Sequence, residues 1–96
     1  MDYITIEDVP KVKLELMNTR HHIGALMTCD RLTDDAILEA LSRYQGLHPE
    51  LVTLIDQSRD DLTCDWIAHA ETIWLKYNVE EIITALQMLL EEPRWD

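Results

Sequence analysis

Apolar residues recur at helical spacing along most of the chain, and the clearest stripe lies in 62–77. Its large apolar side chains follow one another in steps of four, three, one and three residues: Trp66, Ala70, Ile73, Trp74 and Tyr77. Such steps place side chains on one face of a helix. Because an indole is among the largest apolar surfaces that a side chain can bury, we predict that this helix is the central buried element of the fold.

The same spacing predicts three more helices before this one, with inward residues that include Leu16 in the first and Ile37, Leu41 and Tyr44 in the second. The first spans about 9–27, with Asp8 as its N-cap and Pro10 in its first turn, where the missing N–H is not needed. The second follows an N-cap at Thr33 and ends near Gly46, since glycine often terminates helices. The third begins at Pro49.

Asn78 is expected to divide the C-terminal pattern into two helices, over about 63–77 and 79–92, and Pro93 to end it. The predicted fold is therefore all-α: a compact bundle of about five helices, built from the first helix and two helical hairpins. A chain of 96 residues has room for one hydrophobic core. We expect a single helical domain over 1–96, with 1–7 as a short N-terminal arm and 93–96 as a tail.

Composition supports helices and narrows the possible partners. The chain has only two glycines and three prolines, and no run that alternates Val, Ile and Thr. Its net charge is −11, from 19 acidic against eight basic residues. An acidic surface repels nucleic-acid phosphates and anionic lipids, so we expect no direct nucleic-acid binding and no membrane binding. A basic protein surface is the expected partner, although acidity also serves solubility alone.

The cysteines and the N-terminal residues indicate a reducing compartment. Cys29 and Cys64 are too few for a disulfide framework and do not form a C-x-x-C motif, so two buried free thiols are expected. MDYITIEDVP has neither the basic region nor the apolar core of a signal peptide, and no apolar run approaches the length of a membrane span. The expected location is cytoplasmic.

No motif for metal binding or catalysis stands out. A calcium loop starting at Asp56 would need Gly at Asp61 and Glu at Ile67, so it fails at both positions. The four histidines and two cysteines lack the spacing of a zinc site, and His69 is expected to be hydrogen-bonded or half-exposed. The chain has no glycine-rich phosphate loop and no Gly-x-Ser-x-Gly turn. We therefore expect no metal, no cofactor and no enzymatic activity.

The acids that helix physics does not explain indicate a contact site. Six acids lie near predicted helix starts, where they interact favourably with the helix dipole: Asp8, Asp34, Asp35, Asp65, Glu80 and Glu81. Acids at predicted helix ends are unfavourable there, and such local conflicts are typical of functional sites; the expected partner-binding residues are Asp56, Asp60, Asp61, Glu91 and Glu92. The leading hypothesis is a non-enzymatic protein that binds a basic partner as a stoichiometric inhibitor, regulator or adaptor. Small acidic DNA mimics, anti-defence proteins and immunity proteins act in this way.

The second hypothesis is a self-associating structural or scaffolding subunit held by apolar contacts. Leu14 and Met17 lie on a second face of the first helix. Together with Trp95 and the N-terminal Tyr3, Ile4 and Ile6, they would supply the interface of a homodimer.

Overall fold

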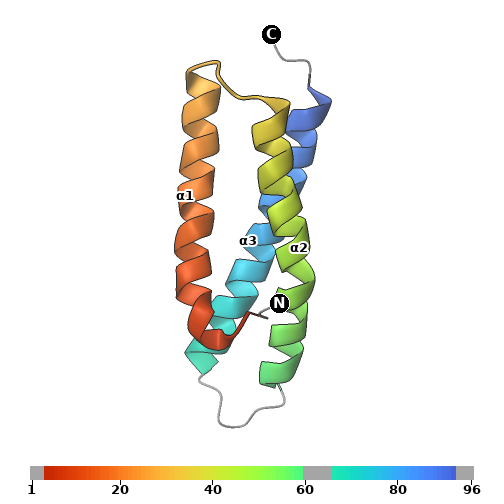
Figure 1. Cartoon of the computed structure of the whole chain (residues 1–96). Helices are drawn as coiled ribbons and strands as arrows, with labels where there is room; N and C mark the ends of the chain where they lie inside the picture. The colour runs from red at the N-terminus through yellow and green to blue at the C-terminus, as the bar shows by residue number, and fades with distance from the viewer. Residues whose placement is uncertain (1–3, 60–65, 93–96) are drawn as a thin grey trace.

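A computed structural model describes residues 4–59 and 66–92, which form three α-helices running up, down and up along one long axis (Figure 1). These are α1 (Val9–Thr28), α2 (Asp34–Arg59) and α3 (Trp66–Glu91), preceded by a 3-10 helix, η1 (Ile6–Asp8). The bundle measures 53 × 22 × 19 Å. The predicted all-α class is confirmed, since no strand occurs among the residues described.

The expected count of about five helices is wrong, because two expected breaks do not occur. α2 runs through Gly46 and Pro49. Its buried positions follow one another in steps of four, three, seven, four and three across both residues, so one continuous side of the helix can be buried: Ile37, Leu41, Tyr44, Leu51, Ile55 and the polar Ser58. This burial offsets the hydrogen bond that Pro49 cannot donate. Gly46 and Pro49 predict a break in the helix, but the spacing of the buried residues continues across both, and the helix follows that spacing.

α3 is likewise continuous through Asn78. The Asn78 side-chain amide donates a hydrogen bond to the backbone carbonyl of Trp74 at 2.8 Å, so it bonds within the helix instead of ending it. Buried residues lie on both sides of Asn78 at steps of three and four: Thr72, Leu75, Val79, Ile82 and Leu86. The proposed start at Thr63 lies outside the described residues.

The central correction concerns the tryptophan stripe. Trp66, Trp74 and Tyr77 are 77%, 41% and 61% exposed, so they do not form the core. Leu75 and Val79 of α3 are fully buried instead. The two stripes lie on different sides of the same helix. The prediction of a buried aromatic stripe rests on the size of the rings, and size does not determine which side of the helix is covered. In this bundle the aliphatic stripe is buried and the aromatic stripe faces solvent.

The core itself is aliphatic, with one tyrosine. It joins Val9, Leu16 and Ile23 of α1 to the α2 and α3 stripes, and the expected inward residues of α2 are confirmed. Tyr44 is 1% exposed, and its hydroxyl donates to Thr19 Oγ1 at 3.0 Å. Thr19 Oγ1 in turn donates to the Glu15 carbonyl at 3.0 Å. The single phenol in the core is thus satisfied, as a buried hydroxyl must be.

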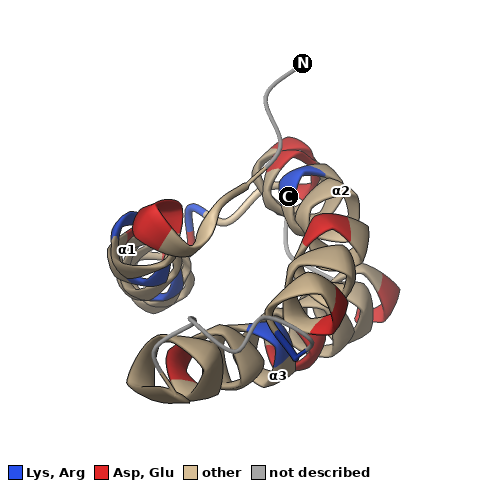
Figure 2. Ribbon diagram, turned by 90° about the horizontal axis from the view of Figure 1, so that it is seen from below, with Lys and Arg blue, Asp and Glu red and all other residues tan. Residues whose placement is uncertain are grey.

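The helix pairs are unequal. α2 and α3 pack closely along their length, whereas α1 approaches α3 over a shorter stretch. Figure 2, a view along the bundle, shows α3 between the other two helices. α1 is held to α2 mainly by side chains that bridge the seam, including the Tyr44 hydroxyl and an ion pair between Arg43 and Glu15. Hence the α1–α3 side and the α1–α2 side present different surfaces.

Two expectations about local chemistry have different outcomes. Thr33 caps α2, because its Oγ1 accepts a hydrogen bond from the Ala36 N–H at 3.2 Å. Asp8 precedes α1 but does not cap it with its side chain. The Asp8 carboxylate instead accepts hydrogen bonds from the Thr5 N–H and hydroxyl, both at 3.1 Å. The first turn of the chain is therefore fixed through Thr5.

Cys29 contradicts the expectation of a buried thiol. α1 ends at Thr28, so Cys29 lies in the exposed turn before α2. Asp30 has a φ of 56°, and the Arg31 N–H bonds to the Leu26 carbonyl at 2.9 Å, which closes the end of the helix. The thiol of Cys29 therefore belongs to the helix terminus and not to the core. Cys64 lies outside the described residues.

Candidate interaction surface

The predicted acidic site is not brought together. Asp56 lies near the end of α2, whereas Glu91 ends α3 and Glu92 follows it. The two helices are antiparallel, so these positions are at opposite ends of the bundle (Figure 1). α3 has 26 residues and spans roughly 39 Å. Asp60 and Asp61 lie outside the described residues, and partner binding by any of these acids stays a prediction.

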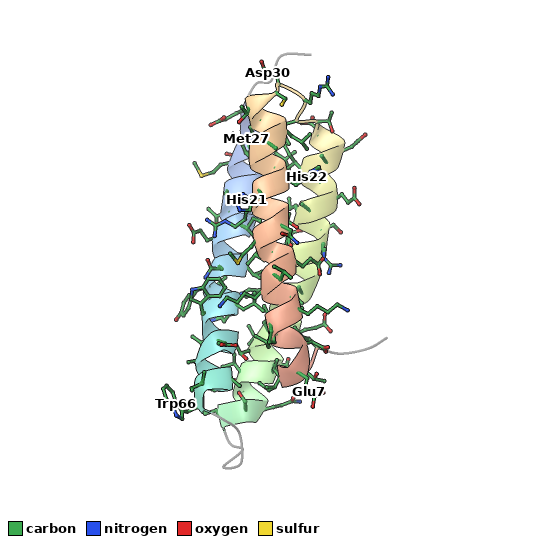
Figure 3. All side chains as sticks on the ribbon, turned by 90° about the vertical axis from the view of Figure 1, so that its left-hand side faces the viewer. Glu7, His21, His22, Met27, Asp30 and Trp66 are labelled. Atoms are coloured by element: carbon green, nitrogen blue, oxygen red, sulfur yellow. The ribbon has the colours of Figure 1, made fainter. Side chains whose placement is uncertain are left out.

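Aromatic side chains form a surface on α3 instead. Trp66, Trp74 and Tyr77 occupy one side of its first half, with exposed Ala70 among them. Figure 3 shows Trp66 projecting away from the bundle at the start of the helix. With the exposed fractions above, the three rings present on the order of 400 Å² to solvent. A contiguous apolar patch of this size is typical of binding sites.

α1 extends this surface across the helix boundary. Leu14 and Met17 are 60% and 46% exposed, and Ile67 of α3 is 50% exposed. The Lys13 ammonium of α1 lies 4.6 Å from the centroid of the Trp74 ring, so the two helices meet beside these residues. We define the aromatic face by its six large apolar members: Leu14, Met17, Trp66, Ile67, Trp74 and Tyr77.

Cations gather at the aromatic face of this acidic chain. Besides Lys13 over Trp74, the Lys76 ammonium lies 4.9 Å from the Tyr77 ring centroid. The Arg20 guanidinium donates to Asn78 Oδ1 at 3.4 Å, one turn further along the α1–α3 boundary. Ammonium–ring contacts stabilise by about 0.5–1 kcal/mol at exposed sites. Acidic residues occur on all three helices (Figure 2), and Lys76 itself lies 3.9 Å from Glu80 Oε1, so both signs of charge border the aromatic face.

The Ser58–His69 pair is the contact most like a catalytic one. Ser58 Oγ lies 2.6 Å from His69 Nδ1 and donates to the Ile55 carbonyl at 3.1 Å. Because the Ser58 hydroxyl donates its one hydrogen to the Ile55 carbonyl, His69 Nδ1 is the donor to Ser58 Oγ. A base that activates a serine nucleophile would instead accept the hydroxyl hydrogen. Ser58 is also 8% exposed. The pair ties α2 to α3, and the expected hydrogen-bonded state of His69 is confirmed.

The other histidines do not converge. His21 and His22 leave α1 in different directions, as neighbours on a helix must (Figure 3). His48 of α2 places Nε2 3.7 Å from Glu80 Oε1, which also lies 3.9 Å from the Lys76 ammonium. Across residues 4–59 and 66–92, no group of three or more His, Cys, Asp or Glu side chains is arranged to hold a metal ion.

The α1–α2 seam contains two open hollows. One has a volume of about 480 Å³ and is lined by apolar residues and by both signs of charge. The other, about 400 Å³, lies beside Tyr44 and His22. Arg43 borders both hollows and is paired with Glu15. Glu15 therefore compensates the charge of Arg43, while Lys11 also lines the first hollow.

No family model, curated protein or solved structure matches this chain, so its surface must be interpreted from its own residues. The helices also set one limit. Within the part of the chain that the structure describes, none of them combines the length and the apolar character that crossing a bilayer requires.

Proposed function

We propose that this protein is a non-enzymatic binding module that recognises another protein chain through the aromatic face. One observation carries the proposal: three of the largest side chains of the chain, Trp66, Trp74 and Tyr77, are uncovered on one side of α3. Single exposed apolar residues are ordinary, but a contiguous group is not. Tryptophan and tyrosine are also the residues that most often dominate the binding energy of interfaces.

The bundle does not need this face for its own stability. Its core is complete without the three rings, because α3 buries Leu75, Val79 and Leu86 at 0–1% exposure. Each large apolar side chain that is left exposed forgoes about 1.5–3 kcal/mol of burial free energy. A partner chain that covers the face would recover part of that free energy on binding.

The acidic residues outside the aromatic face support the role expected for a small inhibitor, regulator or adaptor. A net charge of −11 creates a long-range field that speeds encounter with a basic protein. Asp56 and the end of α3 lie at opposite ends of the bundle, so each forms a separate acidic site. In this proposal the field steers the encounter, and the aromatic face supplies the affinity.

Affinity capture with matched variants tests the proposal. The wild-type protein, Trp66→Glu and Leu38→Glu are immobilised and exposed to extract of the source cell at low and high salt. Leu38 is 49% exposed on α2, outside the aromatic face, and its change adds the same charge. The captured protein should be retained by wild type and Leu38→Glu and lost by Trp66→Glu, and the change in retention with salt reports the charge of the captured surface. Equal retention by both variants would contradict the proposal.

Self-association is the second candidate function. Two residues that were expected in an apolar interface, Leu14 and Met17, are exposed on α1, the helix whose Lys13 contacts Trp74. A structural or scaffolding subunit would use the same face. The occupant of the face therefore distinguishes the two functions.

A further inference from the structure

We propose that the occupant of the aromatic face is a second copy of this chain, which lies antiparallel across the first half of α3. This inference rests on the proposed function, since it names the chain that the aromatic face binds. Three observations lead to it: the spacing of the exposed residues along α3, the area that they present, and the charges around them.

The spacing fits a helix as the occupant. Along the exposed side of α3, Trp66, Ala70, Ile73 and Tyr77 follow one another in steps of four, three and four. This is the repeat by which one helix receives the side chains of another. Ala70 is small and exposed, and Ile73 is half-buried. The middle of the stripe therefore projects less from the helix than its two ends, where the Trp66 and Tyr77 rings lie.

The same spacing is self-complementary. In a two-fold dimer, if residue i meets the partner's residue j, then j meets the partner's residue i. An antiparallel copy centred between Ala70 and Ile73 sets Trp66 against the partner's Tyr77, and Ala70 against the partner's Ile73. Trp66 then meets the partner's tyrosine ring, and the small Ala70 receives an aliphatic side chain. A parallel copy would stack Trp66 on Trp66 and leave Ala70 opposite Ala70.

The area fits a small dimer. The three rings and the three aliphatic members of the aromatic face expose on the order of 600 Å² in each copy. Two copies together would bury about 1,200 Å², the lower end of the range for specific interfaces. Leu14 and Met17 add exposed apolar area on α1, the helix whose Lys13 contacts Trp74.

Charge favours a second copy over a basic partner. Lys13 and Lys76 lie directly over the rings, so a basic surface would meet ammonium groups at the centre of the contact. Glu81 is exposed one turn beyond Tyr77, so both signs border the stripe. For two copies that each carry −11, the Lys13 and Lys76 ammonium groups on this side offset part of the mutual repulsion.

Salt dependence gives the dimer a signature that a basic partner lacks. Two acidic copies repel at long range, and salt screens that repulsion; the screening length falls from about 30 Å at 0.01 M to about 8 Å at 0.15 M. The dimer should therefore become tighter as salt rises, by about threefold or more over this range. Binding of a basic partner would weaken over the same range.

Sedimentation equilibrium of the full chain tests the inference at these two salt concentrations. Wild type is expected to form a dimer that tightens with salt. Trp66→Glu should weaken it by about 30-fold or more, as loss of an aromatic anchor does, and Leu38→Glu should leave it unchanged. Circular dichroism should show equal helicity in all three, since both replaced side chains are largely exposed.

Two outcomes would overturn the inference. One is a wild-type chain that stays monomeric at about 100 µM at both salts, a concentration that detects even weak dimers. The other is a dimer that Trp66→Glu and Leu38→Glu weaken equally. If the chain is monomeric but Trp66→Glu still loses the captured protein, the inference fails and the proposed function stands. If Trp66→Glu affects neither measurement, both fail.

Discussion

The Tyr44 hydroxyl donates a hydrogen bond to Thr19 Oγ1 across 3.0 Å, and this contact joins α2 to α1. Tyr44 is 1% exposed and packs among aliphatic side chains, and together with Thr19 it lines the open hollow of about 400 Å³ in the α1–α2 seam. The Thr19 hydroxyl in turn donates a hydrogen bond to the Glu15 carbonyl. A chain of two hydrogen bonds therefore fixes the position of the helix that packs least extensively.

Removing the phenol should lower stability by a definite amount. Tyr44→Phe loses one buried hydrogen bond and should reduce the free energy of unfolding by about 0.5–1.5 kcal/mol. A double-mutant cycle with Thr19→Val, followed by urea denaturation, should give a coupling energy of similar size. Tyr77→Phe is the matched control, and its effect should stay below about 0.5 kcal/mol because Tyr77 is exposed. A coupling energy near zero would show that the two hydroxyls do not interact.

The continuity of α2 can be tested at Gly46. No backbone φ in the left-handed region occurs at either glycine, and a Cβ added to Gly46 would meet no atom within 4 Å. Gly46→Ala should therefore stabilise the protein by about 0.5–1 kcal/mol through the better helix propensity of alanine. Gly24→Ala provides the reference value for a site inside α1, where the added Cβ is equally free. If Gly46 ended a helix, alanine would instead destabilise the protein in thermal or urea unfolding.

Cys29 should react in the native protein. It is exposed in the turn after α1, where an aromatic disulfide reagent can reach the sulfur without unfolding. The expected result is a rapid phase of thiol modification under native conditions, which is absent from Cys29→Ser. Reaction only after denaturant is added would place the Cys29 thiol in the interior.

Sequence patterning predicted the helical class and much of the core. The inward residues expected in α1 and α2 include Leu16, Ile37 and Tyr44, and all three are buried. A side chain that is apolar and in phase with its neighbours can be placed on an inner face from the sequence alone. The N-cap at Thr33 was found in the same way, because capping depends on local chemistry.

The number of helices could not be predicted in this way, because it depends on a competition between local helix propensity and the burial of apolar side chains. Pro49 and Gly46 lower local helix propensity, whereas the stripe from Ile37 to Ser58 rewards a single unbroken helix. The residue types at 46 and 49 show the loss of helix propensity, and only the packing of α2 against α3 shows the free energy gained by burial. The helical spacing that continues across both residues was the signal that could have decided it.

The aromatic face was missed for a related reason. α3 carries two stripes, one aromatic and one aliphatic, and the sequence does not say which of them meets α2. Aromatic side chains bury the most area when they are covered, so Trp66 and Trp74 were assigned to the core. Val79, Ile82 and Leu86 extend the aliphatic stripe through the second half of the helix, where the aromatic stripe is replaced by Glu81 and Thr84. The longer stripe forms the core.

Whether the tryptophans belong to the surface or to the core is measured most directly by comparing Trp66→Ala with Leu75→Ala. Urea denaturation is followed at a protein concentration low enough that no self-association occurs. Trp66→Ala should change the free energy of unfolding by less than about 0.5 kcal/mol. Leu75→Ala removes a fully buried side chain and should cost about 2–5 kcal/mol. A cost for Trp66→Ala as large as that for Leu75→Ala would return the indole to the core and leave no aromatic face to bind a partner.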